Sequence, residues 1–471
     1  MRCTETGQRI ALFTNSRRLH TTSTTSQTAL LALLLLLVPL ITACSQETNT
    51  SDAPVFWSEP IRVATGNGVR GPWRMNRSNF QYVDDPNAHV TGDGQVAMTW
   101  VDQSRQDIFL QRYDQEGQPR FNTPVNVSGT PDVFSWFPDV IMTDDEPAHV
   151  YVLWQEIVFS GGSHGGEAFF ARSTDGGRTF KEPVNLSQSQ AGDGKGRLTE
   201  DIWHNGSLDL AIGPDGTLFA AWTEYEGRLW FRYSSDGGRT FSDPVRVAGG
   251  RNHRPARGPD LAVSSRNTVH VAWTVGERAT ADIRLRTLRP FSGERSPVRV
   301  VQETSGRSDA PKLTAGTADT LHLVYGEGPA ERTGTDHVRY TRSTNGGRTF
   351  QPPDVLSASG SAPHVRAGYP GLDVNGNTVV VTWEGFDRGR FRTQPVRLMI
   401  AVSRDGGTSF STPALVPGTN APEMGFNGSQ QGLLMGKVDL NRRNDLVVVN
   451  SSFIPNRRSR VYLIRGTIQN R

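Results

Sequence analysis

Residues 173–180 read Ser-Thr-Asp-Gly-Gly-Arg-Thr-Phe, and closely similar blocks occur three more times in the chain. The further copies are Ser234-Ser-Asp-Gly-Gly-Arg-Thr-Phe241, Ser343-Thr-Asn-Gly-Gly-Arg-Thr-Phe350 and Ser403-Arg-Asp-Gly-Gly-Thr-Ser-Phe410. In each block the Ser and Asp (or Asn) oxygens can accept hydrogen bonds from turn amides, and the paired glycines tolerate positive φ. Because every copy needs the same residues, we expect the polar side chain at the third position to stabilise a turn, not to catalyse. These residues are Asp175, Asp236, Asn345 and Asp405.

A proline follows the last phenylalanine of each block by three residues and indicates a further repeated strand. The same spacing occurs at Phe121 and Pro124, after a degenerate turn at 113–117, and two more prolines extend the series. Seven such prolines, 53 to 64 residues apart, stand at Pro60, Pro124, Pro183, Pro244, Pro297, Pro353 and Pro413. Each is interpreted as the outer strand of one blade, so the sequence predicts an all-β, seven-bladed β-propeller, with six blades as the alternative.

The two ends of the repeat each lack part of a blade. The chain ends with three strand-like segments at 436–440, 445–450 and 460–464, and no outer strand follows them. The folded region begins with an outer strand at 60–63 that has no inner strands before it. We therefore expect the N-terminal strand to complete the last blade, which closes the ring and removes its free edges.

The first 43 residues are typical of an export signal. Arginines precede the apolar run Ala29–Leu40, which is too short to be a comfortable membrane-spanning helix. The following Ile41-Thr-Ala-Cys44 resembles the lipobox of bacterial lipoproteins, and a signal peptide cut near Ala43 is the alternative. The resemblance implies a signal peptide at 1–43, a lipidated Cys44 with a flexible tether at 44–54, and a propeller at 55–471. It also implies a lipoprotein held in the bacterial cell envelope, facing the periplasm or the exterior.

Charge and cysteine content narrow the classes of partner. The chain has 50 Lys and Arg against 47 Asp and Glu, and removing the four arginines and one glutamate of the signal segment leaves 46 of each. This balance does not indicate a nucleic-acid partner. The two cysteines are Cys3 and Cys44, so no disulfide is expected in the mature protein. We expect a monomer without a cofactor.

The repeated block matches the Asp-box, Ser-x-Asp-x-Gly-x-Thr-aromatic, and the chain resembles the sialidase-like (BNR, Asp-box repeat) propeller superfamily over nearly its whole mature length. The resemblance implies that ligands bind on the loop face opposite the boxes. Enzymes of that family hold a sugar carboxylate with three arginines and use a tyrosine nucleophile with a glutamate partner and an aspartate acid/base. Guanidinium groups match a carboxylate with paired hydrogen bonds, and a neutral tyrosine limits repulsion of an anionic sugar.

Carried onto this sequence, the resemblance leaves several candidates for each role. The family's opening aromatic-Arg-Ile-Pro motif corresponds to Val83-Asp-Asp-Pro86, where Asp84 replaces the arginine. The substrate-binding candidates are Arg74, Arg77, Arg254, Arg257, Arg366 and His204. The catalytic candidates are Tyr369 as nucleophile, Glu224 or Glu384 as its partner, and Asp107 as acid/base. The missing motif and the seventh blade both count against a standard sialidase.

Two classes of function therefore stay open. The first is an exported, lipid-anchored propeller that acts on or binds acidic glycans, as an exo-sialidase or another glycoside hydrolase. The second is a non-catalytic binding or assembly lipoprotein that uses the same face for a protein or polymer partner. His204, His253 and His364 could also meet near the channel, but their spacing is not diagnostic and no metal site is predicted.

Overall fold

The computed structural model describes residues 54–72, 74, 76–157, 166–188, 207–224, 227–250, 253–276, 281–302, 304, 306–330, 334–357, 365–387, 395–420 and 435–469. All of them belong to one compact unit, Ala53–Arg471. Cys44, His204 and His364 lie outside the described residues. Within those residues, no helix is both long and apolar enough to cross a membrane.

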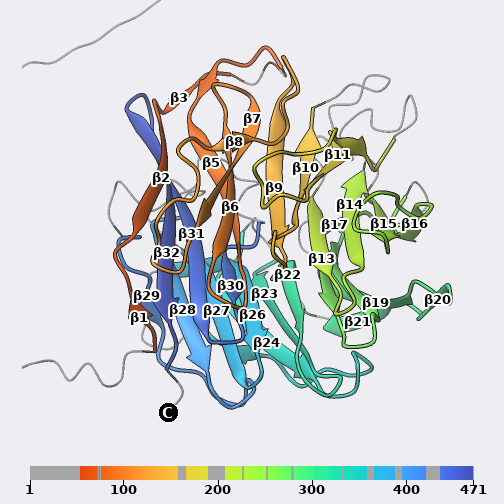
Figure 1. Ribbon diagram of the computed structural model, residues 1–471. Helices are drawn as coiled ribbons and strands as arrows, with labels where there is room; N and C mark the ends of the chain where they lie inside the picture. The colour runs from red at the N-terminus through yellow and green to blue at the C-terminus, as the bar shows by residue number, and fades with distance from the viewer. Residues whose placement is uncertain are drawn as a thin grey trace, which may run out of the picture. The chain divides into compact units, whose positions relative to one another are not determined.

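Seven antiparallel sheets follow one another in chain order around a ring (Figure 1). Blade 1 consists of β5 (Val83–Val90), β6 (Val96–Asp102), β7 (Asp107–Tyr113) and β8 (Val125–Asn126). Blade 2 consists of β9 (Ser135–Met142), β10 (Val150–Glu156), β11 (Glu167–Ser173) and β12 (Val184–Asn185). Blade 3 consists of β13 (Leu208–Ile212), β14 (Leu218–Glu224), β15 (Arg228–Ser234) and β16 (Val245–Ala248).

The remaining blades repeat this plan. Blade 4 consists of β17 (Ala256–Val263), β18 (Val269–Val275) and β19 (Asp282–Arg289), with β20 (Glu294–Arg295) and β21 (Arg299–Gln302) both paired to β19. Blade 5 consists of β22 (Arg307–Ala315), β23 (Leu321–Gly328), β24 (His337–Ser343) and β25 (Asp354–Val355). Blade 6 consists of β26 (Val365–Asn375), β27 (Thr378–Asp387), β28 (Arg397–Ser403) and β29 (Ala414–Leu415). A short hairpin of β3 (Val69–Arg70) and β4 (Phe80–Gln81) precedes blade 1.

Blade 7 contains both ends of the described chain. Its inner strands are β30 (Val438–Leu440), β31 (Asp445–Ile454) and β32 (Arg458–Thr467), and β2 (Ile61–Gly66) and β1 (Phe56–Trp57) pair with β32. Figure 1 shows β2 beside β32, and Ile61 stands opposite Leu463 in the ladder. The predicted seven blades and the predicted ring closure are therefore confirmed, and the six-bladed alternative is excluded.

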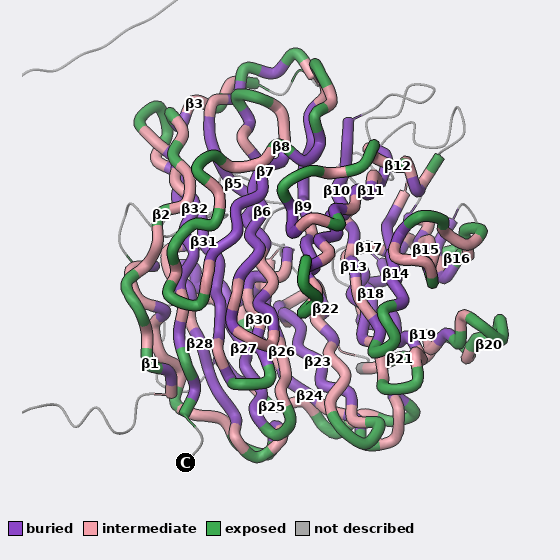
Figure 2. Tube along the Cα trace, in the orientation of Figure 1, coloured by how far each residue is buried: buried purple, intermediate pink, exposed green. Residues whose placement is uncertain are grey.

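The hydrophobic core lies between the blades. The buried side chains of the described residues form seven clusters, and each cluster joins two neighbouring blades, the last of them joining blade 7 to blade 1. Trp154, Trp273 and Trp383, in the second strands of blades 2, 4 and 6, are at most 1% exposed. Burial follows the strands and exposure follows the hairpin tips (Figure 2). Because each large apolar side chain contributes about 1.5–3 kcal/mol when buried, these seven interfaces hold the ring together.

The four repeated blocks form turns at the ends of the third strands. They are called box segments below and comprise residues 173–180, 234–241, 343–350 and 403–410. In the first, Ser173 Oγ accepts the Gly177 N–H at 2.8 Å and Asp175 Oδ1 accepts the Thr179 N–H at 3.0 Å. Thr179 Oγ1 donates to Asp175 Oδ2 at 2.6 Å. Burial raises the pKa of Asp175, but the bonds from Thr179 and Ser173 outweigh it and lower that pKa to about 2. These carboxylates are saturated with turn hydrogen bonds.

The box segments also connect neighbouring blades. Phe241 packs edge-on against Phe170 of the preceding blade, with 5.0 Å between ring centroids, and Phe410 packs in the same way on Tyr340 at 4.8 Å. At Gly407 a Cβ would lie 1.7 Å from the Tyr340 hydroxyl, so only glycine fits there. All four turns lie on one side of the ring, called the box face below, and the loops that start the inner strands lie on the opposite loop face.

Candidate functional site

On the loop face, the inner strands of five blades share a strained β-bulge. In each, a residue with positive φ precedes a proline: Asp85 (φ 48°), Phe137 (φ 55°), Gly258 (φ 55°), Ala310 (φ 52°) and Tyr369 (φ 50°). The strand register shifts at all five. A bulge of this kind re-aims a side chain, and positive φ is costly for a bulky residue. Strain of this kind collects at functional sites, which draws attention to the largest polar side chain among the five, Tyr369.

Tyr369 is half-buried beside an aromatic ring and an arginine from its own blade. Its ring centroid lies 6.0 Å from that of the buried Phe386. The Arg366 guanidinium carbon lies 6.0 Å from the same Phe386 ring. Phe386 therefore supports both polar side chains at the start of β26.

Blades 4 and 5 add an ion-pair cluster next to Tyr369. Asp309 of β22 binds Arg257 of β17 (Nη2 to Oδ1, 2.9 Å) and Arg307 (Nη2 to Oδ2, 2.5 Å; Nε to Oδ2, 3.2 Å). Thr274 Oγ1 donates to Asp309 Oδ1 at 3.1 Å. Burial raises the pKa of Asp309, but Arg257 and Arg307 outweigh it and lower that pKa to about 2. Asp309 is therefore ionised and fixes the two guanidinium groups.

These groups place more guanidinium groups than carboxylates beside a neutral phenol. Three arginines (Arg257, Arg307 and Arg366) and one carboxylate (Asp309) carry a net charge of +2. Burial raises the pKa of Tyr369, Asp309 adds to the rise, and the three arginines oppose it. Arg257 Nε is buried without an acceptor among the described residues, so one of its donors is not used by the blades. An anionic ligand with a proton-accepting oxygen fits this site, called the Tyr369 site below.

The predicted carboxylate partners are held within the blades. Glu224 accepts the indole N–H of Trp222 at 3.1 Å and that of Trp230 at 2.8 Å. Asp107 accepts hydrogen bonds from Asn126 and Ser128, both at 2.8 Å. These bonds join strands of one blade, so they favour a structural role for Glu224 and Asp107.

Glu384 forms a buried ion pair with Lys437 across the interface between blades 6 and 7. Their side chains are 1% and 4% exposed. Burial raises the pKa of Glu384, and Lys437 opposes the rise. Although Glu384 stands opposite Gly368 in the ladder, next to Tyr369, its carboxylate is engaged by the lysine.

Two of the other predicted arginines lie between β3 and β4, before blade 1. Arg74 and Arg77 belong to the turn between β3 and β4, where the Arg77 N–H donates to the Arg74 carbonyl. Asn76 ties that turn to blade 2, since its side chain donates to the Ile157 carbonyl at 3.0 Å and accepts the Phe134 N–H at 3.1 Å. The Tyr369 site, by contrast, is built from blades 4, 5 and 6.

Arg254 precedes β17, three residues before Arg257. Of the predicted substrate-binding set, the structure thus brings Arg257 and Arg366 together with Tyr369. It adds Arg307 and Asp309, which were not among the predicted site residues. Their signal is the repeated residue-proline pair that follows them at Ala310 and Pro311.

Asp84, which replaces the family's first arginine, is fully buried. It accepts a hydrogen bond from the Gln103 amide at 3.0 Å, and Gln103 in turn accepts the Trp136 indole N–H at 2.9 Å. Burial raises the pKa of Asp84, and the adjacent Asp85 adds to the rise. A buried carboxyl group here cannot replace an arginine in binding an anionic sugar.

The central channel is lined by a polar ring and encloses about 320 Å³. Each carboxylate of the ring accepts a backbone N–H of the next blade: Asp139 that of Leu210 (2.8 Å) and Asp209 that of Leu261 (2.7 Å). Lys312 interrupts the series and donates to Asp260 at 2.8 Å. The polar members are Asn87, Asp139, Asp209, Asp260, Lys312, Asp373 and Asp439. The channel side chains thus connect neighbouring blades through hydrogen bonds. Among the described residues, no cluster suited to a metal ion occurs.

Replacing Asp139 with asparagine should change how stability depends on pH. Burial raises the pKa of Asp139 to about 6 from an ordinary 3.8, so its contribution to folding is present at low pH and is lost as the pH rises through about 6. Relative to that of Asp139→Asn, the free energy of unfolding of the wild type should fall by up to about 3 kcal/mol between about pH 4 and 6. Chemical denaturation measures this change. Asn87 accepts the Val140 N–H at 3.0 Å in the equivalent place, so asparagine should fit. A pH-independent difference would contradict this assignment.

Comparisons with known proteins give a fold but no family. No protein-family model matches the sequence, and no curated protein does. Among solved structures, a polysaccharide lyase PL25 ulvan lyase bound to -[GlcA(1-4)Rha3S]- has a TM-score of 0.53 and 13% identity, covering 86% of this chain and 96% of that one. The polysaccharide lyase Uly1 has a TM-score of 0.51 and 12% identity, covering 88% and 100%. Hadza microbial sialidase Hz136 has a TM-score of 0.41 and 17% identity, covering 65% and 66%. At these identities the first two show the fold alone.

Proposed function

We propose that this protein acts on an acidic polysaccharide whose sugar carboxylate is held at the Tyr369 site. The observation that carries the proposal is the set of three arginines around a strained, protonated tyrosine. Arg257 and Arg307 are pre-oriented by Asp309, which reduces the entropy lost when an anion binds. Paired guanidinium donors match a carboxylate in geometry and charge.

In this proposal a water molecule takes the proton from C5 of the uronate, a C4–C5 double bond forms as the bond between C4 and the glycosidic oxygen breaks, and Tyr369 donates its proton to the leaving oxygen. The proton lost from C5 returns to Tyr369 through solvent. Burial keeps the phenol protonated, and a general acid must hold its proton until the bond breaks. The carboxylates predicted for hydrolysis, Glu224, Glu384 and Asp107, are engaged by scaffold groups. This engagement favours elimination of a uronate, which needs neutralisation of the sugar carboxylate, over sialidase-type hydrolysis. The glucuronate in the ligand of the ulvan lyase supports a uronate as the ligand here.

The experiment is to incubate the compact unit Ala53–Arg471 with ulvan, with a second uronate polymer and with a fluorogenic sialoside. New reducing ends together with ultraviolet absorbance of an unsaturated uronate would indicate elimination. Reducing ends without that absorbance would indicate hydrolysis of a polymer, and fluorescence would indicate a sialidase. Binding without any product would support the second candidate, a non-catalytic acidic-glycan receptor, which the engaged carboxylates also favour.

We further propose that the protein is exported and anchored by a lipid on Cys44. The support is the apolar run that ends in Ile41-Thr-Ala-Cys44. In a bacterial host, labelled palmitate should enter the full-length chain and not the Cys44→Ala variant, measured in the membrane fraction. Equal labelling of both chains would contradict the anchor, and a soluble, cleaved, unlabelled chain would indicate an ordinary signal peptide.

A further inference from the structure

Blade 4 departs from the repeat on the box face. In blades 2, 3, 5 and 6 the third strand ends in a box segment. In blade 4 the third strand, β19, instead continues into a hairpin with β20, in which Arg289 stands opposite Glu294. This hairpin projects from the body of the ring (Figure 1). Its tip residue Phe291 contacts Tyr233 of blade 3 edge-on, with 5.4 Å between ring centroids. The hairpin thus keeps an aromatic contact to the preceding blade without the saturated carboxylate of a box segment.

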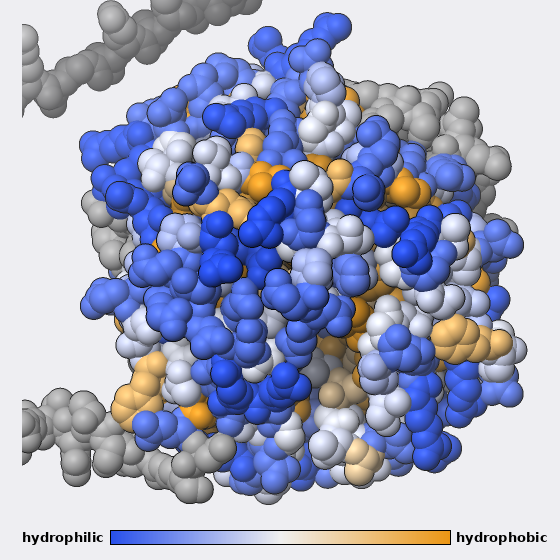
Figure 3. Space-filling model, viewed as in Figure 1, coloured by the Kyte–Doolittle hydropathy of each residue, from blue (hydrophilic) through white to orange (hydrophobic). Residues whose placement is uncertain are grey.

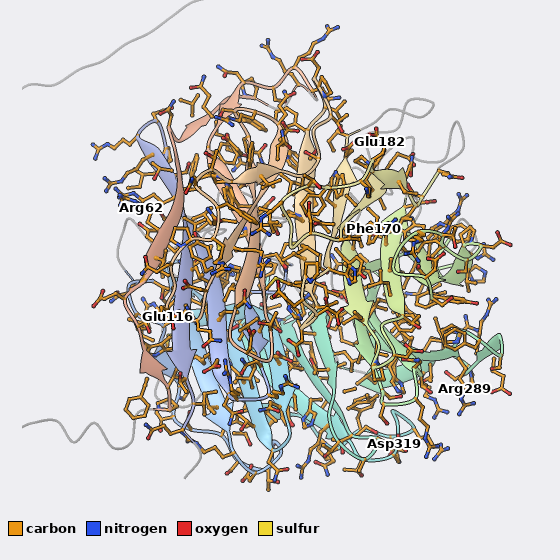
Figure 4. The ribbon with its side chains drawn as sticks, in the orientation of Figure 1. Arg62, Glu116, Phe170, Glu182, Arg289 and Asp319 are labelled. Atoms are coloured by element: carbon orange, nitrogen blue, oxygen red, sulfur yellow. The ribbon has the colours of Figure 1, made fainter. Side chains whose placement is uncertain are left out.

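A groove of about 870 Å³ lies beside this hairpin, between blades 4 and 5. Its charged lining residues are five arginines and two acids, which give a net charge of +3. The arginines are Arg266, Arg289, Arg295, Arg299 and Arg348, and the acids are Glu294 and Asp319. Figure 4 shows Arg289 and Asp319 on the same lower side of the ring. Basic and acidic residues are nearly equal in number over the whole chain, but basic residues are in excess in this groove.

Few of these arginines are neutralised by a fixed partner. Arg289 pairs with Glu294 at 2.7 Å, but both side chains are more than 60% exposed, so water screens the pair. Arg299 Nη1 donates to the Arg348 backbone carbonyl at 3.1 Å, which leaves its charge in place. Arg266, Arg295 and Arg348 are exposed. The groove can thus offer several guanidinium groups to phosphate oxygens.

An apolar side chain stands among these charges. Phe291 is 58% exposed, the most exposed large hydrophobic residue among those described. In the space-filling view a small apolar spot lies beside hydrophilic surface where the hairpin projects (Figure 3). Exposed aromatic residues next to arginines are typical of surfaces that enter the headgroup region of a membrane. A small soluble phosphate compound would leave the Phe291 ring exposed to water, whereas a membrane would bury it.

The box face is also where the described chain begins. In the box segment of blade 6, Arg404 Nη2 donates to the Pro54 carbonyl at 3.2 Å and its Nε donates to the Gln469 carbonyl at 3.1 Å. Both ends of the described chain therefore reach the ring on this face, together with the basic groove. The loop face with the Tyr369 site is the opposite one.

We propose that the groove between blades 4 and 5 binds the phosphate headgroups of anionic lipids, with Phe291 entering the headgroup layer. The ring then rests on the membrane by its box face and presents the Tyr369 site away from it. This site is independent of the proposed glycan activity and of the lipid on Cys44.

The test is co-sedimentation of unlipidated Ala53–Arg471 with vesicles of phosphatidylcholine, alone or mixed with equal parts of phosphatidylglycerol. Binding should require phosphatidylglycerol and should weaken with added salt. The double variant Arg295→Gln, Arg348→Gln should bind about twenty-five-fold more weakly, since each basic residue at an anionic surface contributes about five-fold. Phe291→Ser should weaken binding several-fold further.

The matched control is Arg62→Gln, Arg105→Gln, which removes the same charge from two exposed arginines outside the groove. It should bind as the wild type does, and all variants should keep the wild-type melting temperature. Equal loss in the control, or equal binding to both kinds of vesicle, would overturn the proposal. Binding of soluble glycerol phosphate or dextran sulfate without vesicle binding would identify a soluble anion or a sulfated polymer instead, and would also overturn it.

Discussion

Replacing Tyr369 with phenylalanine should lower the turnover of the acidic polysaccharide by about a hundred-fold or more, because a positioned general acid contributes at least that factor. The Kd for the polysaccharide should change by no more than a few-fold, since the arginines and the Phe386 platform stay in place. Initial rates and calorimetric binding on the same preparations measure the two quantities. Because burial raises the pKa of Tyr369, its acid form should persist above the pH at which an ordinary tyrosine ionises.

Two further variants separate proton transfer from binding. Arg307→Met should raise the Kd by about ten- to a hundred-fold, because a hydrogen bond to a charged group contributes about 1.5–3 kcal/mol. Tyr151→Phe is the matched control, since Tyr151 is 5% exposed in blade 2 and lies near Gly237 of a box segment. It should leave both turnover and Kd unchanged. If Tyr369→Phe turned over at the wild-type rate, its role as the acid would be wrong even if the arginines bound the glycan.

Replacing Lys437 with methionine should destabilise the ring by about 3–5 kcal/mol near neutral pH. The change leaves the Glu384 carboxylate, which is 1% exposed, without its cation at the interface between blades 6 and 7. Because burial raises the pKa of Glu384, lowering the pH should protonate it and reduce the loss. Urea denaturation at two pH values measures both effects.

The double variant Glu384→Gln, Lys437→Met serves as the control for this pair. Without a buried charge, it should recover most of the lost stability, since removal of both partners of a buried pair is often close to neutral. A loss under about 1 kcal/mol in Lys437→Met would show that the ion pair contributes little. A double variant as unstable as the single one would point instead to lost packing around Gly371, where the Lys437 backbone lies close.

The sequence predicted the architecture because repetition records it directly. The spacing from Pro60 to Pro413 counts the blades, and the incomplete repeats at the two ends predict the pairing of β2 with β32. Each box segment needs the same turn bonds, so its residues recur at every copy. Residues that every blade needs recur at a fixed spacing, and this spacing can be recognised in a single sequence.

The site was only partly predictable because the bulge repeats from blade to blade but the side chains around it do not. Tyr369 and Arg366 were among the candidates that the family resemblance implied, but Arg307 and Asp309 belong to the neighbouring blade and meet Arg257 across an interface. Glu224 is a catalytic candidate from the sequence, but two indole N–H groups donate to its carboxylate in the structure. Contacts between blades depend on where each bulge aims a side chain, and sequence spacing does not carry that information.

The pairing of β2 with β32 has a consequence for biogenesis. β2 is made early in synthesis, whereas its partner is complete only at Thr467, near the end of the chain. Until then the N-terminal strand is an exposed edge that can pair with other chains, and blades already formed lack the last interface of the ring. The protein should therefore be most vulnerable to proteolysis and aggregation just before its final strand arrives, and a truncation of even that strand should cost the whole ring.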